Sequence, residues 1–247
     1  MAFHRIIAGL FLMTVFIGAV VCQQPDSETV RKEFEAYVSK LPTVDYERVE
    51  SGTAEELERR KRIGRRYDDE GWVQRDPHHA TGKIGRVDEV PPPPLLPVKE
   101  SALVIAGKVV SANAYLSNDK RGIYTEFSIC VSEVLKSDSR DQAVKNGGCI
   151  TADRPGGVVR MPTGQRVIYT DWNRELPQVG KEYAMFLTRD NISPNYSMLR
   201  LYELSDKRVT PVDHNRLVDE LKLAGKSEFL ARIRKEVTLM SEPASKP

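Results

Sequence analysis

Bulky apolar and polar residues alternate in short runs between residues 101 and 212, and clusters of turn-forming residues separate the runs. Examples are GIYTEFSICVSEVLKS and KEYAMFLTR, with SNDKRG, KNGG and RPGG among the separators. Alternation with a period of two places successive side chains on opposite faces of a strand. Seven or eight such runs without an intervening helical period predict an OB-like antiparallel β-barrel or a small sandwich.

Two helical patterns precede the β-rich region. Residues 26–40 place four apolar side chains on one helical face, namely Val30, Phe34, Tyr37 and Val38. Thr53 and Glu56 have the spacing of a capping box, which predicts that a second helix begins directly after Thr53. The second helix is almost wholly polar, so we expect it to lie mainly in solvent.

Residues 76–97 have no hydrophobic period and include four consecutive prolines. Proline can neither donate to a strand ladder nor continue a helix, so this segment predicts a polyproline II linker at a domain boundary. A helical pattern returns after the β-rich region. Asp213 and Ser227 are the predicted caps of two C-terminal helices, and Phe229, Ile233 and Val237 form an apolar stripe on the second. The predicted fold is therefore mainly β with flanking helices.

The N-terminus carries a short basic segment and then an uninterrupted apolar run over residues 6–21. This run is shorter than the ~20 residues that a membrane-spanning helix needs, and it is typical of a secretory signal peptide. Cleavage after Cys22 would leave no transmembrane span. The alternatives are lipidation of Cys22 and an uncleaved anchor. We expect a secreted or periplasmic, cell-envelope protein.

These patterns divide the chain into six parts: a signal peptide (1–22), a helical extension (23–75), a Pro-rich linker (76–100), a β-barrel domain (101–212), C-terminal helices (213–240) and a disordered tail (241–247). The chain has 37 Lys and Arg residues against 35 Asp and Glu residues. Because the two signs nearly balance, the chain lacks the overall basic field of a nucleic-acid-binding protein, and we expect no specific nucleic-acid binding.

The mature chain would retain two of the three cysteines, Cys130 and Cys149. An even pair in an oxidising compartment predicts a disulfide, and a buried pair of free thiols is the alternative. A catalytic cysteine would need a base, but the three histidines that follow the signal lie in linker or helix-start positions. Two cysteines also provide too few ligands for a zinc site. We therefore predict no catalytic residue, no metal and no cofactor.

The sharpest charge feature is the sequence RRKRIGRR over residues 59–66. Its candidate anion-contacting residues are Arg59, Arg60, Lys61, Arg62, Arg65 and Arg66. Such a run can contact an anionic surface. The alternative is a self-neutralised exposed helix, because Glu55, Glu56 and Glu58 precede Arg59, Arg60 and Arg62 by four residues.

A second candidate lies in the loop after the run RVIYT, where Asp171, Trp172, Arg174 and Glu175 could form a binding loop. Trp172 would be its aromatic anchor and Arg174 its polar group, whereas the alternative is that Trp172 caps the core. Glu126 and Glu133 are an odd number of positions apart on one predicted strand. They therefore face opposite sides and cannot act as an acid–base couple.

Several stretches resemble a family of uncharacterised exported bacterial proteins, namely ESALVIAGKVVSANAYLSNDKRGIYTEFSICVSEVLKS, RPGG and LPQVGKEYAMFLTR. This resemblance covers residues 95–213 and implies export and a fold but no activity. More distantly, the order of these motifs is similar to that in netrin-like modules, including tissue inhibitors of metalloproteases, which use an OB-type barrel. The chain lacks the N-terminal cysteine framework through which those inhibitors present a metal-chelating amine, so the resemblance implies the barrel without inhibition.

Together these patterns favour an exported, non-catalytic binding or interaction module. Its expected partner is a protein or an anionic envelope component. One alternative is a hydrolase or transferase with its residues on the barrel loops, where Asp171, Arg174 and Glu175 are the best candidates. Another is a structural envelope protein anchored at its N-terminus.

Overall fold

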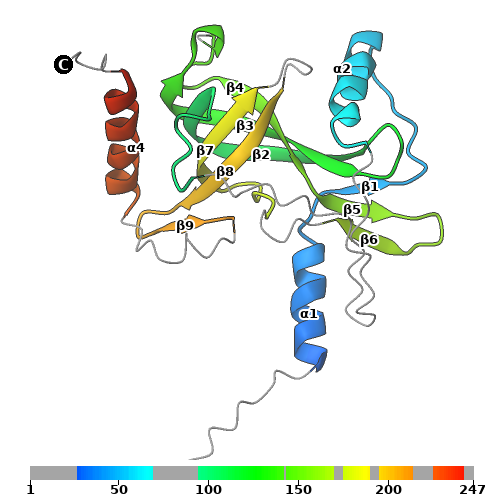
Figure 1. Cartoon of the computed structure of the whole chain (residues 1–247). Helices are drawn as coiled ribbons and strands as arrows, with labels where there is room; N and C mark the ends of the chain where they lie inside the picture. The colour runs from blue at the N-terminus through cyan, green and yellow to red at the C-terminus, as the bar shows by residue number, and fades with distance from the viewer. Residues whose placement is uncertain are drawn as a thin grey trace, which may run out of the picture.

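The chain is built mainly from β-strands, in a six-stranded and a three-stranded sheet (Figure 1). The computed structural model describes residues 27–68, 94–141, 143–169, 175–189, 195–213 and 225–241. The larger sheet contains β2 (Leu103–Leu116), β3 (Ile123–Ser137), β4 (Cys149–Pro155), β7 (Glu182–Arg189), β8 (Tyr196–Leu204) and β9 (Val209–Pro211). Its strand order is β4-β3-β2-β7-β8-β9, and these neighbours are antiparallel. The predicted antiparallel β-structure is therefore confirmed.

An additional pairing joins the two ends of this sheet. β4 runs parallel to β8 at two positions, where Ala152 pairs with Tyr196 and Asp153 pairs with Ser197. The alternation within β3 directs Phe127, Ile129 and Val131 into the main core. That core also contains Leu103, Ile105, Val109, Ala152, Tyr183, Met185, Leu187, Tyr196, Met198 and Leu201. Glu126 and Ser128, which alternate with these residues, consequently lie on the opposite, outer face of β3.

The smaller sheet connects the N-terminal part of the chain to the β-rich region. It contains β1 (Thr43–Asp45), β5 (Gly157–Arg160) and β6 (Arg166–Tyr169), in the order β1-β5-β6. β1 pairs with β5 in parallel. Only helices were predicted within residues 23–75, and β1 was missed because three residues are too few to show an alternation. Buried Val44 packs here with Ala114, Ile123 and Val159.

The described helices are α1 (Ser27–Val38), α2 (Ala54–Arg65) and α4 (Lys226–Ser241). α1 lies within the predicted 26–40 segment, and Thr53 is the N-cap of α2 as predicted. The Glu56 backbone N–H donates to Thr53 Oγ1 over 3.2 Å. None of the helices in the described part of the chain combines the length and apolar character needed to cross a membrane.

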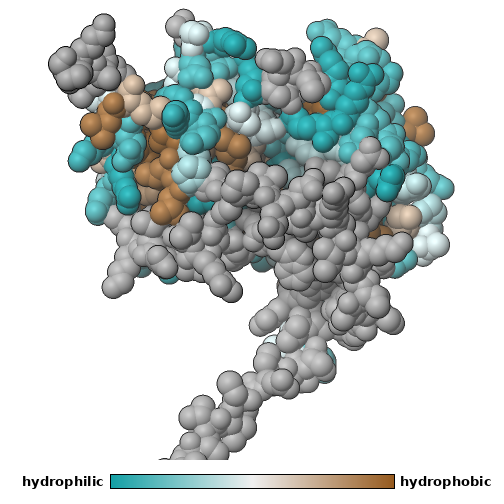
Figure 2. Space-filling view, in the orientation of Figure 1, coloured by the Kyte–Doolittle hydropathy of each residue, from teal (hydrophilic) through white to brown (hydrophobic). Residues whose placement is uncertain are grey.

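α4 packs on a second core through its predicted apolar stripe. Phe229, Leu230 and Ile233 are buried there against residues of the larger sheet such as Phe186 and Tyr202. Figure 2 shows apolar side chains gathered beside α4 and hydrophilic ones over α2. Several predicted segments lie outside the described residues: the signal peptide, most of the Pro-rich linker, the short helix after Asp213, and nearly all of the tail.

Candidate functional site

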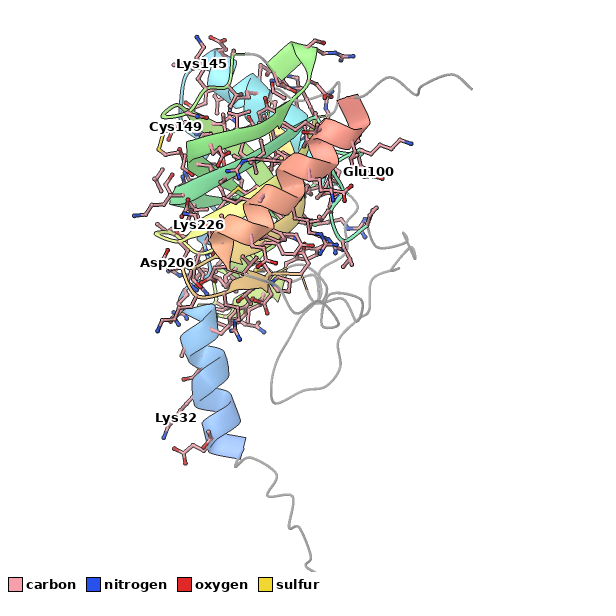
Figure 3. All side chains as sticks on the ribbon, turned by 90° about the vertical axis from the view of Figure 1, so that its left-hand side faces the viewer. Lys32, Glu100, Lys145, Cys149, Asp206 and Lys226 are labelled. Atoms are coloured by element: carbon pink, nitrogen blue, oxygen red, sulfur yellow. A yellow bond between two sulfur atoms is a disulfide. The ribbon has the colours of Figure 1, made fainter. Side chains whose placement is uncertain are left out.

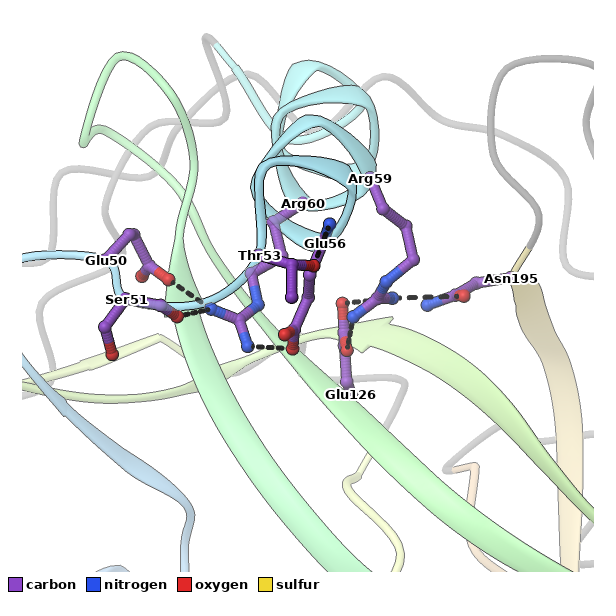
Figure 4. Close-up of polar contacts among 8 residues, drawn as sticks. All are labelled: Glu50, Ser51, Thr53, Glu56, Arg59, Arg60, Glu126 and Asn195. Carbon is purple, nitrogen blue, oxygen red and sulfur yellow. Dashed lines mark hydrogen bonds and ion pairs between the residues drawn. The ribbon is translucent and has the colours of Figure 1, made fainter.

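A polar layer joins α2 to the outer face of β3 and β4. Glu126 and Asp153 are directly opposite each other on these strands, and both carboxylates are buried. Arg59 forms a bidentate pair with Glu126, with Nη2 3.0 Å from Oε2 and Nη1 3.1 Å from Oε1 (Figure 4). Arg66 donates to Asp153 over 2.7 Å. Each buried carboxylate is therefore neutralised by an arginine from the same helical segment.

Asp153 accepts two further hydrogen bonds. The Tyr67 hydroxyl donates over 2.6 Å and the Ser197 hydroxyl over 3.2 Å. Burial raises the pKa of Asp153 above its ordinary value, because the loss of hydration outweighs the effect of the Arg66 charge. Burial, together with the Asp153 charge, also raises the pKa of Tyr67 well above its ordinary value. Tyr67 therefore stays protonated near neutral pH and keeps its hydrogen to donate.

Aromatic rings complete the layer under α2. Tyr124 stacks between Tyr67 and Tyr115, with ring centroids 4.9 and 5.6 Å apart. The Arg60 guanidinium lies over the Tyr115 ring at 4.9 Å from its centroid. Arg60 also donates to Glu50 over 2.8 Å and to Glu56 (Figure 4). These contacts secure one side of α2 to the sheet by both packing and charge.

The basic run of α2 consequently divides between two sides of the helix. Arg59 and Arg66 turn toward the sheet, and Lys61 pairs with Glu58 in solvent. Arg62 and Arg65 are exposed on the outer side. Of the ion pairs expected along a self-neutralised helix, the Glu56–Arg60 pair is present. Arg59, however, pairs with Glu126 of β3 and not with Glu55. Contact of the exposed basic residues with an anionic surface stays a prediction.

Two adjoining pockets, of about 360 and 510 Å³, open where the β3–β4 connection meets the end of β7. Both are lined by Arg140, Asp141 and Arg189. The first also contacts the start of β8 through Asn195 and Tyr196. Asn195 Oδ1 accepts a hydrogen bond of 3.2 Å from Arg59 (Figure 4). The polar layer under α2 and the first pocket therefore share a residue.

A buried carboxylate organises the shared wall of the pockets. Asp141 accepts a 2.7 Å hydrogen bond from the Tyr196 hydroxyl, and Arg189 Nη1 lies 3.1 Å from the same Oδ1 atom. The Arg189 guanidinium lies 5.0 Å from the centroid of the Tyr196 ring. Burial, and then the hydrogen bond to Asp141, raises the pKa of Tyr196. The Arg189 guanidinium is thus held by the Asp141 carboxylate and by the face of the Tyr196 ring.

The predicted disulfide is present between Cys130 and Cys149, which are directly opposite each other on β3 and β4. Cys149 is exposed and lines the first pocket. Figure 3 shows Cys149 close to Lys145, another pocket residue, along one edge of the molecule. The disulfide therefore closes the base of the β3–β4 connection that supplies much of the pocket wall, and it is consistent with an extracellular protein.

Three of the four residues of the predicted binding loop, Asp171, Trp172 and Arg174, lie outside the described residues. Glu175 is half-buried and does not line either pocket. The sequence did not single out the pocket residues Arg140, Asp141, Arg189 and Asn195, since polar residues in turns and at strand ends look like solvated surface. Within the described ranges, no group of three or more His, Cys, Asp or Glu residues is placed to hold a metal ion.

Comparison of the chain with models of known protein families and with curated protein sequences gives no match. The resemblance to exported bacterial proteins and to netrin-like modules thus stays a prediction. Any assignment of function has to come from the geometry of the pockets and of the polar layer beside them.

Proposed function

We propose that the chain is an exported, non-catalytic binding module built on an OB-type barrel. The pairing pattern supports the barrel: β2, β3, β4, β8 and β7 each pair with the next, and β7 pairs with β2. Only the β4–β8 step of this circuit is parallel. An OB fold is a five-stranded Greek-key barrel that binds ligands on one face and in its loops. A signal peptide would deliver the module to the envelope or the extracellular space.

The pockets are the proposed ligand site. α2 covers the outer face of β3 and β4 at Glu126 and Asp153, so that part of the face is occupied within the chain itself. The two pockets open beside it, and each has a volume within the ~300–1,000 Å³ of small-molecule sites. The observation that carries the proposal is that buried Asp141 and the Tyr196 ring hold the partly exposed Arg189 in the wall common to both pockets. Such a wall is organised before a ligand arrives.

The test is ligand screening by NMR on the full mature chain, with separate pools of saccharides, peptides and small acids. A ligand of the proposed site should shift backbone amides around Asp141, Thr151 and Arg189. Ala143→Trp, which places a large side chain at the exposed lining of the first pocket, should abolish those shifts. Thr163→Trp, in the exposed turn before β6, is the matched control and should preserve them. Folded protein that binds no pool, or only at other surfaces, would contradict the proposal.

A further inference from the structure

We propose that the two pockets form one site for a ligand that carries an oxyanion, that is, a carboxylate, phosphate or sulfate group. This inference rests on the proposed binding function and specifies the chemical class of the ligand. Arg140 and Arg189 are the recognition residues, and both line both pockets. The shared arginines are the reason to treat the two hollows as a single site.

Arg189 is oriented for this role before any ligand binds. A guanidinium has five N–H donors in a rigid fork. Asp141, whose side chain is 1% exposed, lies within an ion-pair distance of one terminal nitrogen, and Tyr196 supports the plane from below. The Arg189 side chain is itself 32% exposed and lines both pockets. A guanidinium held in this way can meet an oxyanion with little loss of conformational freedom, which favours bidentate binding.

The charge around the first pocket has the sign that the proposal needs. Its described lining carries three cations, Arg140, Lys145 and Arg189, against the single carboxylate of Asp141. The second pocket adds Asp138, but Lys136 lies 3.3 Å from that carboxylate and offsets its charge. The local field therefore attracts an anion, although the chain as a whole is close to neutral, at +2.

Arg140 sits at the entrance on a short 3-10 turn, Ser139–Asp141, and its side chain is exposed. The turn is anchored because the next residue along, Asp141, is buried by Tyr196 and Arg189. Arg140 can therefore bind the anion from the solvent side, while Arg189 binds it from the inner wall of the pocket. Arg140 is also a suitable position for a test, because its side chain is exposed.

The experiment is isothermal titration calorimetry of the full mature chain against four probes: inorganic phosphate, inorganic sulfate, polygalacturonate and neutral dextran. The variants are Arg140→Gln and Arg189→Gln, with Arg208→Gln in the exposed β8–β9 turn as the matched control. Binding of at least one anionic probe should weaken about ten-fold or more in both pocket variants and stay unchanged in R208Q. It should also weaken as salt is added, because exposed charges are screened. Binding of the inorganic ions would indicate a free ion as ligand, and binding of polygalacturonate alone would indicate an acidic polymer.

Arg189 also neutralises buried Asp141, so Arg189→Gln can lower stability. The decision therefore rests on Arg140→Gln, with circular dichroism to show that the variant is folded. Equal anion binding by R140Q and R208Q would overturn the proposal. Shifts at the pocket caused only by neutral saccharides or peptides in the NMR screen would overturn the ligand class but leave the binding function standing. No ligand at the pocket in either experiment would overturn both.

Discussion

Replacing Arg59 with alanine should destabilise the fold much more than replacing its neighbour Lys61. Both residues are basic, both belong to α2, and each forms an ion pair with a glutamate, so they differ chiefly in their surroundings. The Arg59 and Glu126 side chains are 24% and 7% exposed, whereas those of Lys61 and Glu58 are 62% and 64% exposed. Arg59→Ala leaves the Glu126 carboxylate buried without its bidentate partner. Lys61→Ala leaves Glu58 in water.

The magnitudes follow from this difference in burial. Breaking a buried ion pair by removing one partner costs about 3–5 kcal/mol. Because Arg59 keeps some exposure, we expect a somewhat smaller loss of ~2–4 kcal/mol of unfolding free energy. At roughly 2–4 °C per kcal/mol, the Tm should fall by about 4–16 °C. An exposed pair contributes about 0–1 kcal/mol, so Lys61→Ala should change the Tm by a few degrees at most.

Urea unfolding followed by circular dichroism measures both variants. Glu126→Ala and the double variant Arg59→Ala/Glu126→Ala complete a double-mutant cycle. The double variant should lose clearly less than the sum of the two single losses, because it leaves no unpaired buried charge. Small and equal losses in R59A and K61A, or strict additivity in the cycle, would refute the view that a buried ion pair holds α2 on β3.

Three further predictions concern other parts of the fold. Replacing both Cys130 and Cys149 with serine should lower the free energy of unfolding by about 3 kcal/mol, which is the loop-closure value for their separation of 19 residues. Thiol labelling of both cysteines in the native protein without reductant would contradict the disulfide. Gly122→Ala should destabilise the fold by at least ~1–3 kcal/mol in thermal unfolding, because the added Cβ would lie 2.2 Å from the backbone carbonyl oxygen of Tyr67. Gly225→Ala, where the nearest atom lies at 3.6 Å, should change the stability only slightly. Because burial raises the pKa of Asp153 above 3.8, the folded chain holds this proton to higher pH than the unfolded chain. The stabilising contribution of this protonated carboxyl is complete below the unfolded pKa and falls as pH rises through the folded pKa. In urea titrations, the stability of the wild type relative to Asp153→Asn should therefore fall from acidic toward neutral pH. An opposite slope would contradict a raised pKa at Asp153.

Local patterns in the sequence predicted a large part of the fold. Thr53 and Glu56 predicted the start of α2, the four-residue recurrence of Phe229, Ile233 and Val237 predicted the face of α4, and alternation predicted β2 and β3. Each of these signals depends on residues a few positions apart. The disulfide was predictable for a different reason, namely that a chain expected to be exported and cleaved after Cys22 would retain two cysteines.

The spacing of residues in α2 indicates that one face of this helix packs on the sheet, although the acid–base pairs along the helix also fit an exposed helix. Arg59, Ile63 and Arg66 are spaced at i, i+4 and i+7, which places them on one helical face. Ile63 is fully buried, and both arginines reach the sheet from that face. Counting acids four residues before each base made this face look like solvated surface, because the acids that neutralise the arginines lie far away in the chain.

The sequence by itself therefore determined the longer strands β2 and β3, the helices α1, α2 and α4, and the cysteine pair, since each depends on local periodicity or on residue type. Only the tertiary structure decided that β4 meets β8, that α2 lies over two buried carboxylates, and that Arg140 and Arg189 share a pocket wall. Arg59 contacts Glu126 and Asn195 across 67 and 136 positions of the chain. The helical spacing of Arg59, Ile63 and Arg66 marks the buried face of α2 but does not identify the partners of the arginines, because those partners are selected by the burial of one charge against another once the sheet has formed.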